Sequence, residues 1–92
     1  MKTARIFISG FVQGVGFRYF VKKNAQDLGL TGWVRNTPDG RVEAFLQGSE
    51  VDIEKMIKLC RKGPFLSEVK DVGASWEDQR EDLEGFKILQ YG

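Results

Sequence analysis

Apolar residues recur along this chain with two different periods, and the periods predict its secondary structure. Alternation of apolar and polar residues is typical of half-buried strands, and apolar residues every three or four positions are typical of amphipathic helices. Strands are expected over residues 5–9, 31–36, 41–47, 69–76 and 86–91. Helices are expected over residues 17–28 and from the residue after Ser49 to Lys62.

The connections between these elements are also predicted. The residues Pro38-Asp39-Gly40 are typical of a β-turn, so the strands on either side of them are expected to form a hairpin. In the fourth strand the alternation changes phase between Val69 and Val72, which predicts a β-bulge near Asp71. The acidic stretch over residues 77–85 is expected to be a solvated loop before the short final strand.

The order of the elements predicts the fold class. Strand, helix, strand, strand, helix and strand follow one another, with one extra short strand at the end. Right-handed crossovers then place both helices on one face of a mostly antiparallel sheet, which is the ferredoxin-like α/β sandwich of the α+β class. At 92 residues the chain is expected to form a single domain over residues 1–92. This fold hosts many unrelated functions and does not name one.

Composition narrows the possible chemistry. The chain has no histidine, which excludes histidine acid–base catalysis, Ser-His triads and histidine metal sites. Cys60 is its single cysteine, so no intrachain disulfide can form, and we expect a reducing, cytoplasmic location. The sequence contains no signal peptide or long apolar run, so no membrane association is expected. Its carboxylates also lack metal-ligand spacing, and no metal is expected.

The segment from Gly10 to Arg18 is the strongest candidate for a binding site. It leads from a strand into a helix through Gly14 and Gly16, whose flexible backbone can direct several N–H groups at one anion. Arg18 adds a planar fork of donors suited to phosphate oxygens. Residues 1–47 carry seven Lys and Arg against three Asp and Glu, which favours an anionic ligand. Glycines at this spacing also serve plain turns, so a purely structural role of this loop is the alternative.

Two further groups of residues allow more than one interpretation. Asn36 ends a strand before a turn, and asparagine is common at such positions. In the alternative interpretation, its side chain faces the glycine loop, the phosphate cradle over residues 13–18, and orients a water molecule. Phe7 and Phe45 point away from the predicted core, and aromatic residues on such strands stack bases in RNA-recognition domains. RNA binding is disfavoured because Glu43 places a negative charge on the same face, and because the sequence lacks the motif of RNA-recognition domains. Trp33 and Trp76 are most simply packing residues, and Cys60 a small buried hydrophobic one.

Taken together, the glycine loop, the arginine and the asparagine resemble the acylphosphatase family. The likeness covers nearly the whole chain and is weaker over residues 50–85. Its most specific blocks are residues 10–18 (GFVQGVGFR) and 28–36 (LGLTGWVRN), extended by residues 39–43 (DGRVE) and by the closing pattern of Phe86, Ile88 and Tyr91. Because the chain is short, we expect the stand-alone form of this family.

The resemblance implies an activity and a role for each matching residue. The reaction is hydrolysis of the carboxyl-phosphate anhydride of an acyl phosphate to a carboxylate and inorganic phosphate. Backbone N–H groups of Gln13, Gly14, Val15, Gly16, Phe17 and Arg18 would bind the phosphoryl group. Arg18 would also hold its oxygens, and Asn36 would position the attacking water. No metal, other cofactor or covalent intermediate is implied. The partners are a small acyl phosphate and inorganic phosphate, with no nucleic acid, and we expect a monomer.

The sequence departs from the family pattern at two places. Phe11 stands where many members carry a basic residue, which weakens attraction of an anionic substrate. The chain ends at Gly92, one residue beyond the usual terminal tyrosine, so pairing of its end carboxylate with Arg18 stays open. A non-enzymatic module that binds anions with the same cradle is the first rival function, and an RNA-binding domain is the second.

Overall fold

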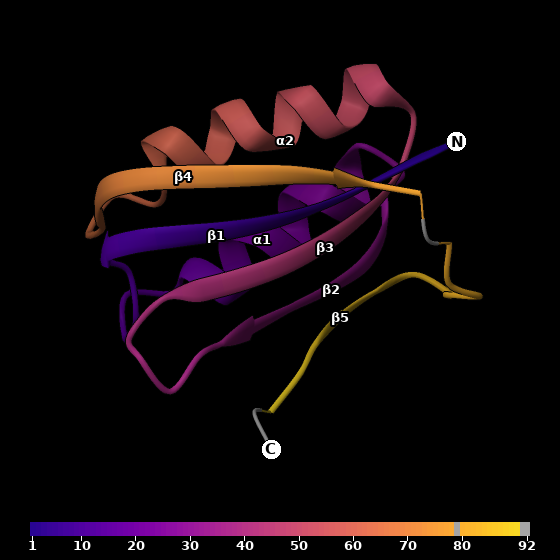
Figure 1. Ribbon diagram of the computed structural model, residues 1–92. Helices are drawn as coiled ribbons and strands as arrows, with labels where there is room; N and C mark the ends of the chain where they lie inside the picture. The colour runs from indigo at the N-terminus through magenta and orange to yellow at the C-terminus, as the bar shows by residue number, and fades with distance from the viewer. Residues whose placement is uncertain (79, 91–92) are drawn as a thin grey trace.

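A computed structural model describes residues 1–78 and 80–90 and contains one sheet with two helices (Figure 1). The elements in chain order are β1 (Lys2–Phe11), α1 (Phe17–Asp27), β2 (Thr31–Asn36), β3 (Val42–Gly48), α2 (Glu50–Lys62), β4 (Glu68–Glu77) and β5 (Phe86–Ile88). Their order is the predicted one, and both helices lie on the same face of the sheet, so the ferredoxin-like fold is confirmed. The first and fourth strands are longer than the sequence pattern indicated.

The sheet has the order β4-β1-β3-β2-β5, so β1 and β2 are separated by β3. The pairs β1–β4, β1–β3 and β2–β3 are antiparallel, and β5 runs parallel to β2. The predicted hairpin is therefore β2 and β3. The predicted bulge lies at Lys70, because Ser9 faces Asp71 while Gly10 faces Val69.

The final strand is shorter than expected. Parallel pairing with β2 ends at Ile88, and the backbone N–H of Leu89 still donates to the carbonyl of Val34 at 2.8 Å. Tyr91, which belonged to the predicted strand and to the closing family pattern, lies outside the described residues, as does Gly92.

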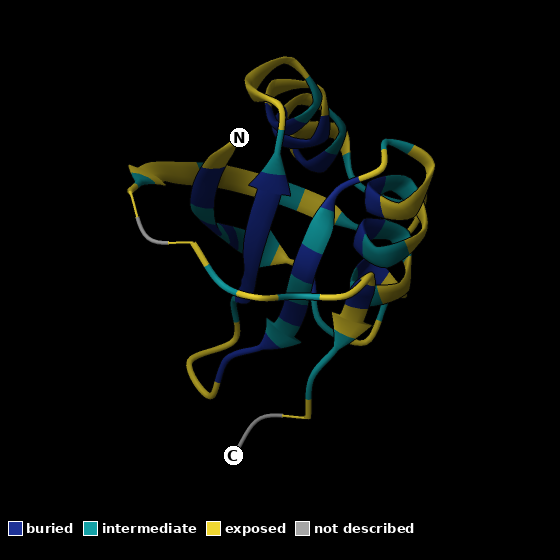
Figure 2. Ribbon diagram, turned by 90° about the vertical axis from the view of Figure 1, so that its right-hand side faces the viewer, coloured by how far each residue is buried: buried dark blue, intermediate teal, exposed yellow. Residues whose placement is uncertain are grey.

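The core lies between the sheet and the helices. Alternate residues of β1, such as Ile6 and Ile8, are fully buried against Val21 of α1, Ile53 of α2 and their neighbours. Figure 2 shows buried residues along the central strands and on the helix faces turned toward them. The predicted helical stripes, including Cys60, all face this core.

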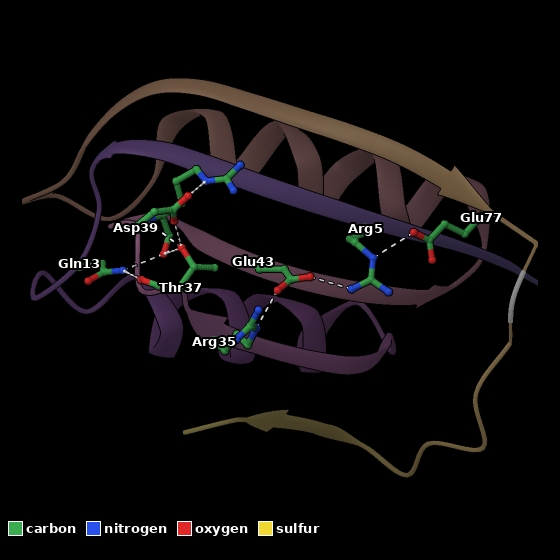
Figure 3. A network of polar contacts seen from close by, with 8 residues as sticks. Arg5, Gln13, Arg35, Thr37, Asp39, Glu43 and Glu77 are labelled. Carbon is green, nitrogen blue, oxygen red and sulfur yellow. Dashed lines mark hydrogen bonds and ion pairs between the residues drawn. The ribbon is translucent and has the colours of Figure 1, made fainter. Parts of the chain in front are cut away.

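The opposite face of the sheet carries a network of ion pairs in place of helices (Figure 3). Glu43, which is 5% exposed, accepts hydrogen bonds from Arg5 and from Arg35, each at 2.7 Å. Arg5 also donates to Glu77 at 3.0 Å. One carboxylate thus links β1, β2 and β3, and Arg5 extends the link to β4.

Candidate active site

The loop between β1 and α1 has the backbone conformation that its glycines permit. Gly14 and Gly16 lie at φ values of 76° and 81°, in the left-handed region that glycine enters without steric cost. A Cβ at either position would meet no described atom within 4 Å, so the space beside both residues is open. The loop is therefore accessible to a ligand along its backbone.

The start of α1 leaves its backbone donors unused. Gly16 is the N-cap, and among the described residues no side chain caps this end and no acidic residue lies in the first turn. The first bond of the helix runs from Phe20 N–H to the carbonyl of Gly16, so the N–H groups of Phe17, Arg18 and Tyr19 have no acceptor within the helix. These donors and the positive end of the helix dipole favour an anion.

By contrast, α2 begins with an ordinary side-chain cap. The Ser49 hydroxyl accepts from the N–H of Asp52 at 3.2 Å, and Glu50 and Asp52 place negative charge in the first turn. The two helices of one chain therefore differ where they begin, and only α1 begins beside a glycine loop. The open end of α1 is a local feature of the loop rather than a general property of this fold.

Arg18 and Asn36 meet at a single pocket of about 250 Å³ at the end of the sheet. Its described lining residues are Val12, Gly14, Gly16, Phe17, Arg18, Tyr19, Asn36, Ile88 and Gln90. Within the described part of the chain Arg18 forms no ion pair, so its guanidinium is available to a ligand. Arg18 and Asn36 thus line the same pocket, while their roles in a reaction stay predictions.

Asn36 lines this pocket and carries a buried acceptor without a partner in the described part of the chain. The residue is 9% exposed, and its Oδ1 has no hydrogen-bond partner among the described residues. A buried polar atom without a partner costs about 1–3 kcal/mol. Because Asn36 also lines the pocket, its carboxamide lies beside the free donors and is suited to position a water molecule.

Two of the predicted loop residues turn their side chains elsewhere. Gln13 and Val15 do not line the pocket. Val15 packs against the core, and the Gln13 amide nitrogen donates to the carbonyls of Thr37 and Arg41, both at 2.8 Å (Figure 3). Their backbone remains part of the loop, which is the role the resemblance gave them.

The turn between β2 and β3 is held by bonds that the sequence pattern did not predict. The Thr37 hydroxyl bonds to Asp39 and accepts from the N–H of Arg41, and Arg41 pairs with Asp39 at 2.9 Å. The hydroxyl of Thr37 and, less strongly, the guanidinium of Arg41 lower the pKa of the Asp39 carboxyl. These residues were interpreted only as a turn. The signal available was a threonine and an aspartate at the spacing of a side-chain-capped turn.

The open face of the sheet does not offer the stacking surface of an RNA-recognition domain. Phe45 is fully buried there, because Trp33 stacks on it with ring centroids 6.0 Å apart and Arg5 lies over both rings. Arg41 covers Phe7 at 4.5 Å from its ring centroid. The two aromatic rings on which the RNA-binding alternative rested are thus occupied by other side chains.

The remaining titratable and structural features give no second site. Cys60 is fully buried, and burial raises the pKa of its thiol to about 12, so it is unreactive. Within residues 1–78 and 80–90, no three His, Cys, Asp or Glu side chains are grouped as metal ligands. Neither helix formed by the described residues is long and apolar enough to span a membrane.

Comparisons with known proteins give a consistent result. The family model for acylphosphatase matches residues 4–88. An acylphosphatase of Trichormus variabilis is 49% identical over 83 residues, which are 90% of this chain and 81% of the relative. An acylphosphatase of Methanocella arvoryzae is 44% identical, over 96% of this chain and 99% of the relative. The crystal structure of acylphosphatase from Bacillus subtilis superimposes with a TM-score of 0.94 at 38% identity, covering 97% of this chain and 99% of that one.

Proposed function

The chain belongs to the acylphosphatase family and hydrolyses acyl phosphates, and we propose that it does so in the pocket between the glycine loop and β2. The observation that carries this proposal is that the uncapped start of α1, Arg18 and Asn36 all line one pocket. A phosphoryl group needs donors around its oxygens and a water on its far side, and this pocket can supply both.

Binding of the phosphoryl group is assigned to the loop and to Arg18. The backbone N–H groups over residues 13–18 and the positive end of α1 act on the equatorial oxygens. The guanidinium of Arg18 provides a fork of parallel donors, and each bond of this charged kind contributes about 1.5–3 kcal/mol. These contacts strengthen as negative charge shifts onto the oxygens in the transition state.

The hydrolytic step is assigned to a water held by Asn36. The carboxamide of Asn36 holds the water by a hydrogen bond, and the water oxygen attacks phosphorus in line with the acyl oxygen. The bond between phosphorus and the acyl oxygen breaks, and the carboxylate leaves with the electron pair. The water proton passes to a phosphoryl oxygen, which gives inorganic phosphate. No protein base is then needed, because the phosphoryl group itself takes the proton. Little general-acid help is needed either, because a carboxylate is a good leaving group.

The charge of the pocket favours a reaction without a metal ion. Arg18 and the helix end present positive charge, and among the described lining residues there is no Asp or Glu to bind a divalent cation. We therefore propose that activity persists when chelator is added. Loss of activity in EDTA that returns with Mg²⁺ would contradict this part of the proposal.

The decisive experiment measures benzoyl phosphate hydrolysis by the pure protein. Arg18→Ala is expected to lose phosphate affinity and activity together. Asn36→Ala is expected to lose turnover, by about a hundredfold or more, while inorganic phosphate still inhibits competitively. Matched controls are Arg61→Ala on the exposed side of α2 and Asn24→Ala, whose amide bonds only to its own helix. Lost phosphate affinity in a folded Asn36→Ala would contradict its role in holding the water.

The same proposal includes the setting in which the enzyme works. We propose a single-domain, cytoplasmic monomer whose partners are a small acyl phosphate and inorganic phosphate, without nucleic acid. The charge distribution, the single buried thiol and the occupied aromatic face support these assignments. Light scattering at micromolar concentration tests the monomer, and a dimer at that concentration would contradict it.

A further inference from the structure

Gln13 joins two parts of the site that the sheet itself does not join. The row of paired residues that crosses β1, β3 and β2 ends at Ile8, Val42 and Asn36. Beyond that row, β1 continues to Phe11 with β4 as its only strand partner. The glycine loop therefore leaves the sheet on one side of β3, and Asn36 ends its strand on the other side.

The Gln13 side chain bridges this gap with both of its donors. Its Nε2 carries two hydrogens, and it donates to the carbonyl of Thr37 and to the carbonyl of Arg41, both at 2.8 Å. These carbonyls flank the β2–β3 turn, and the N–H of Thr37 also donates to the Arg41 carbonyl at 2.8 Å. The amide thus continues the hydrogen bonding of the hairpin toward the glycine loop.

A primary amide of this length satisfies both carbonyls without adding a charge. A glutamate would present oxygens to two acceptors, a methionine has no donor, and an asparagine is shorter by one methylene. Because both Nε2 hydrogens are used, the side chain has no donor left for a phosphate oxygen. Its contribution to the site is therefore indirect.

The bond acts on the residue next to Asn36. Thr37 follows Asn36 directly, and the turn beyond it is held by the contacts of Thr37, Asp39 and Arg41 described above. The turn and Asn36 therefore move as one piece, and Gln13 fixes that piece relative to the loop. A displacement of about 1 Å between a catalytic group and the bound substrate can reduce the rate about a hundredfold.

We infer that Gln13 is a positioning residue, which holds the carboxamide of Asn36 in register with the phosphate cradle through the backbone of the β2–β3 turn. The inference rests on the proposed function, since it assigns Gln13 a role in placing the water that Asn36 holds. It predicts that Gln13 affects turnover and leaves phosphate binding nearly unchanged, because the backbone donors of the cradle are intact without its side chain.

The test compares Gln13→Met with wild type in benzoyl phosphate hydrolysis. We expect kcat to fall about 10- to 100-fold, and the inhibition constant of inorganic phosphate to change less than about threefold. In an Asn36→Ala background, Gln13→Met should reduce kcat by less than about twofold, because the residue it positions is already absent. A purely structural role would produce the same loss in both backgrounds.

Gln47→Met is the matched control. Gln47 likewise donates through Nε2, to the carbonyl of Glu81 at 3.0 Å and to the Thr31 hydroxyl at 3.3 Å, but it lies at the opposite end of the hairpin. The Gln47→Met variant should lower the urea midpoint of unfolding without lowering kcat. Should Gln13→Met not fold, Gln13→Asn keeps the amide but cannot reach both carbonyls, and the same kcat and phosphate measurements apply to it.

Three results would overturn the inference: unchanged kcat in Gln13→Met, a phosphate inhibition constant that rises in step with the loss of kcat, or an equal further loss in the Asn36→Ala background. The proposed function fails by a different result, which is full turnover in Asn36→Ala alone. If Asn36→Ala loses turnover and Gln13→Met does not, only the positioning role of Gln13 is wrong.

Discussion

At the scale of single residues, two glycines of the sheet and loops have positive φ for different reasons. Gly32 lies at φ 146° in β2, and a Cβ there would collide with the carbonyl oxygen of Phe45 on the neighbouring strand. Gly29, after α1, lies at φ 73° with open space around it. Only a local backbone preference requires glycine at position 29, whereas at position 32 the approach of another strand excludes any side chain.

Alanine substitutions should separate these two requirements. Gly29→Ala is expected to lower the free energy of unfolding by about 1–2 kcal/mol, the cost of a left-handed L-residue. Gly32→Ala should lower it by more than about 3 kcal/mol, because the β2–β3 pairing must also shift. Urea unfolding of the two variants gives both numbers, and equal losses would argue against the steric explanation for Gly32.

Cys60 predicts a loss of stability in alkali. Its folded pKa of about 12 lies above the ordinary thiol value of 9.0, so folding favours the protonated form. The contribution of this protonated thiol is complete below pH 9 and falls as pH rises from 9 toward 12, by about 1.4 kcal/mol per pH unit. The stability of wild type minus that of Cys60→Ala should shrink over this range. A constant difference would mean that the thiol does not ionise on unfolding.

At the scale of elements, the open face of the sheet is held together by charge and by stacking. Glu43 of β3 lies between Arg5 of β1 and Arg35 of β2, while Arg5 also covers the stacked rings of Trp33 and Phe45. Removing the central carboxylate leaves two guanidinium groups near each other without their shared acceptor. The Trp33–Phe45 stacking and the pair of Arg5 with Glu77 then remain as side-chain links between strands on this face.

Glu43→Gln should therefore destabilise the sheet without abolishing catalysis. We expect a loss of about 2 kcal/mol in the free energy of unfolding, since the bonds to a charged acceptor are weakened and both arginines are partly solvated. Glu54→Gln, on the exposed side of α2, is the control and should change it by less than about 0.5 kcal/mol. A loss in Glu43→Gln no larger than in the control would mean that the network contributes nothing.

At the scale of the whole molecule, the sequence predicted what local periodicity and capping determine. The element order, the faces of both helices, the hairpin and the bulge in β4 depend on residues close together in the chain, and the structure confirms them. The family resemblance assigned Arg18 and Asn36 to one site. Both line one pocket, and their catalytic roles stay predictions.

What the sequence did not predict depends on which distant elements meet. The Gln13 side chain bonds to residues 24 and 28 positions away, and alternation cannot indicate such partners. The burial of Phe45 was missed because alternation assigns it to an open face, while Trp33 and Arg5 cover it there. The early end of β5 was missed because a short parallel edge strand has no hairpin to set its length.

Inorganic phosphate should stabilise the fold on the proposed binding mode. A ligand that binds only the folded state adds about 2.7 kcal/mol at a concentration one hundred times its dissociation constant. We expect the melting temperature of wild type to rise with phosphate concentration, and that of Arg18→Ala to stay nearly constant at equal ionic strength. Sulfate-free buffer with chloride as the balancing anion is the reference condition. A rise of equal size in both proteins would indicate a general salt effect.

The missing cap of α1 has a consequence for how the enzyme ends its own reaction. On the proposed binding mode, the donors that no side chain caps bind the substrate and also the phosphate released from it, so the product can occupy the start of the helix in its turn. Accumulating phosphate then slows hydrolysis and protects the protein from unfolding through one and the same equilibrium. If phosphate binds as proposed, the first turn of α1 couples product inhibition to the stability of the fold.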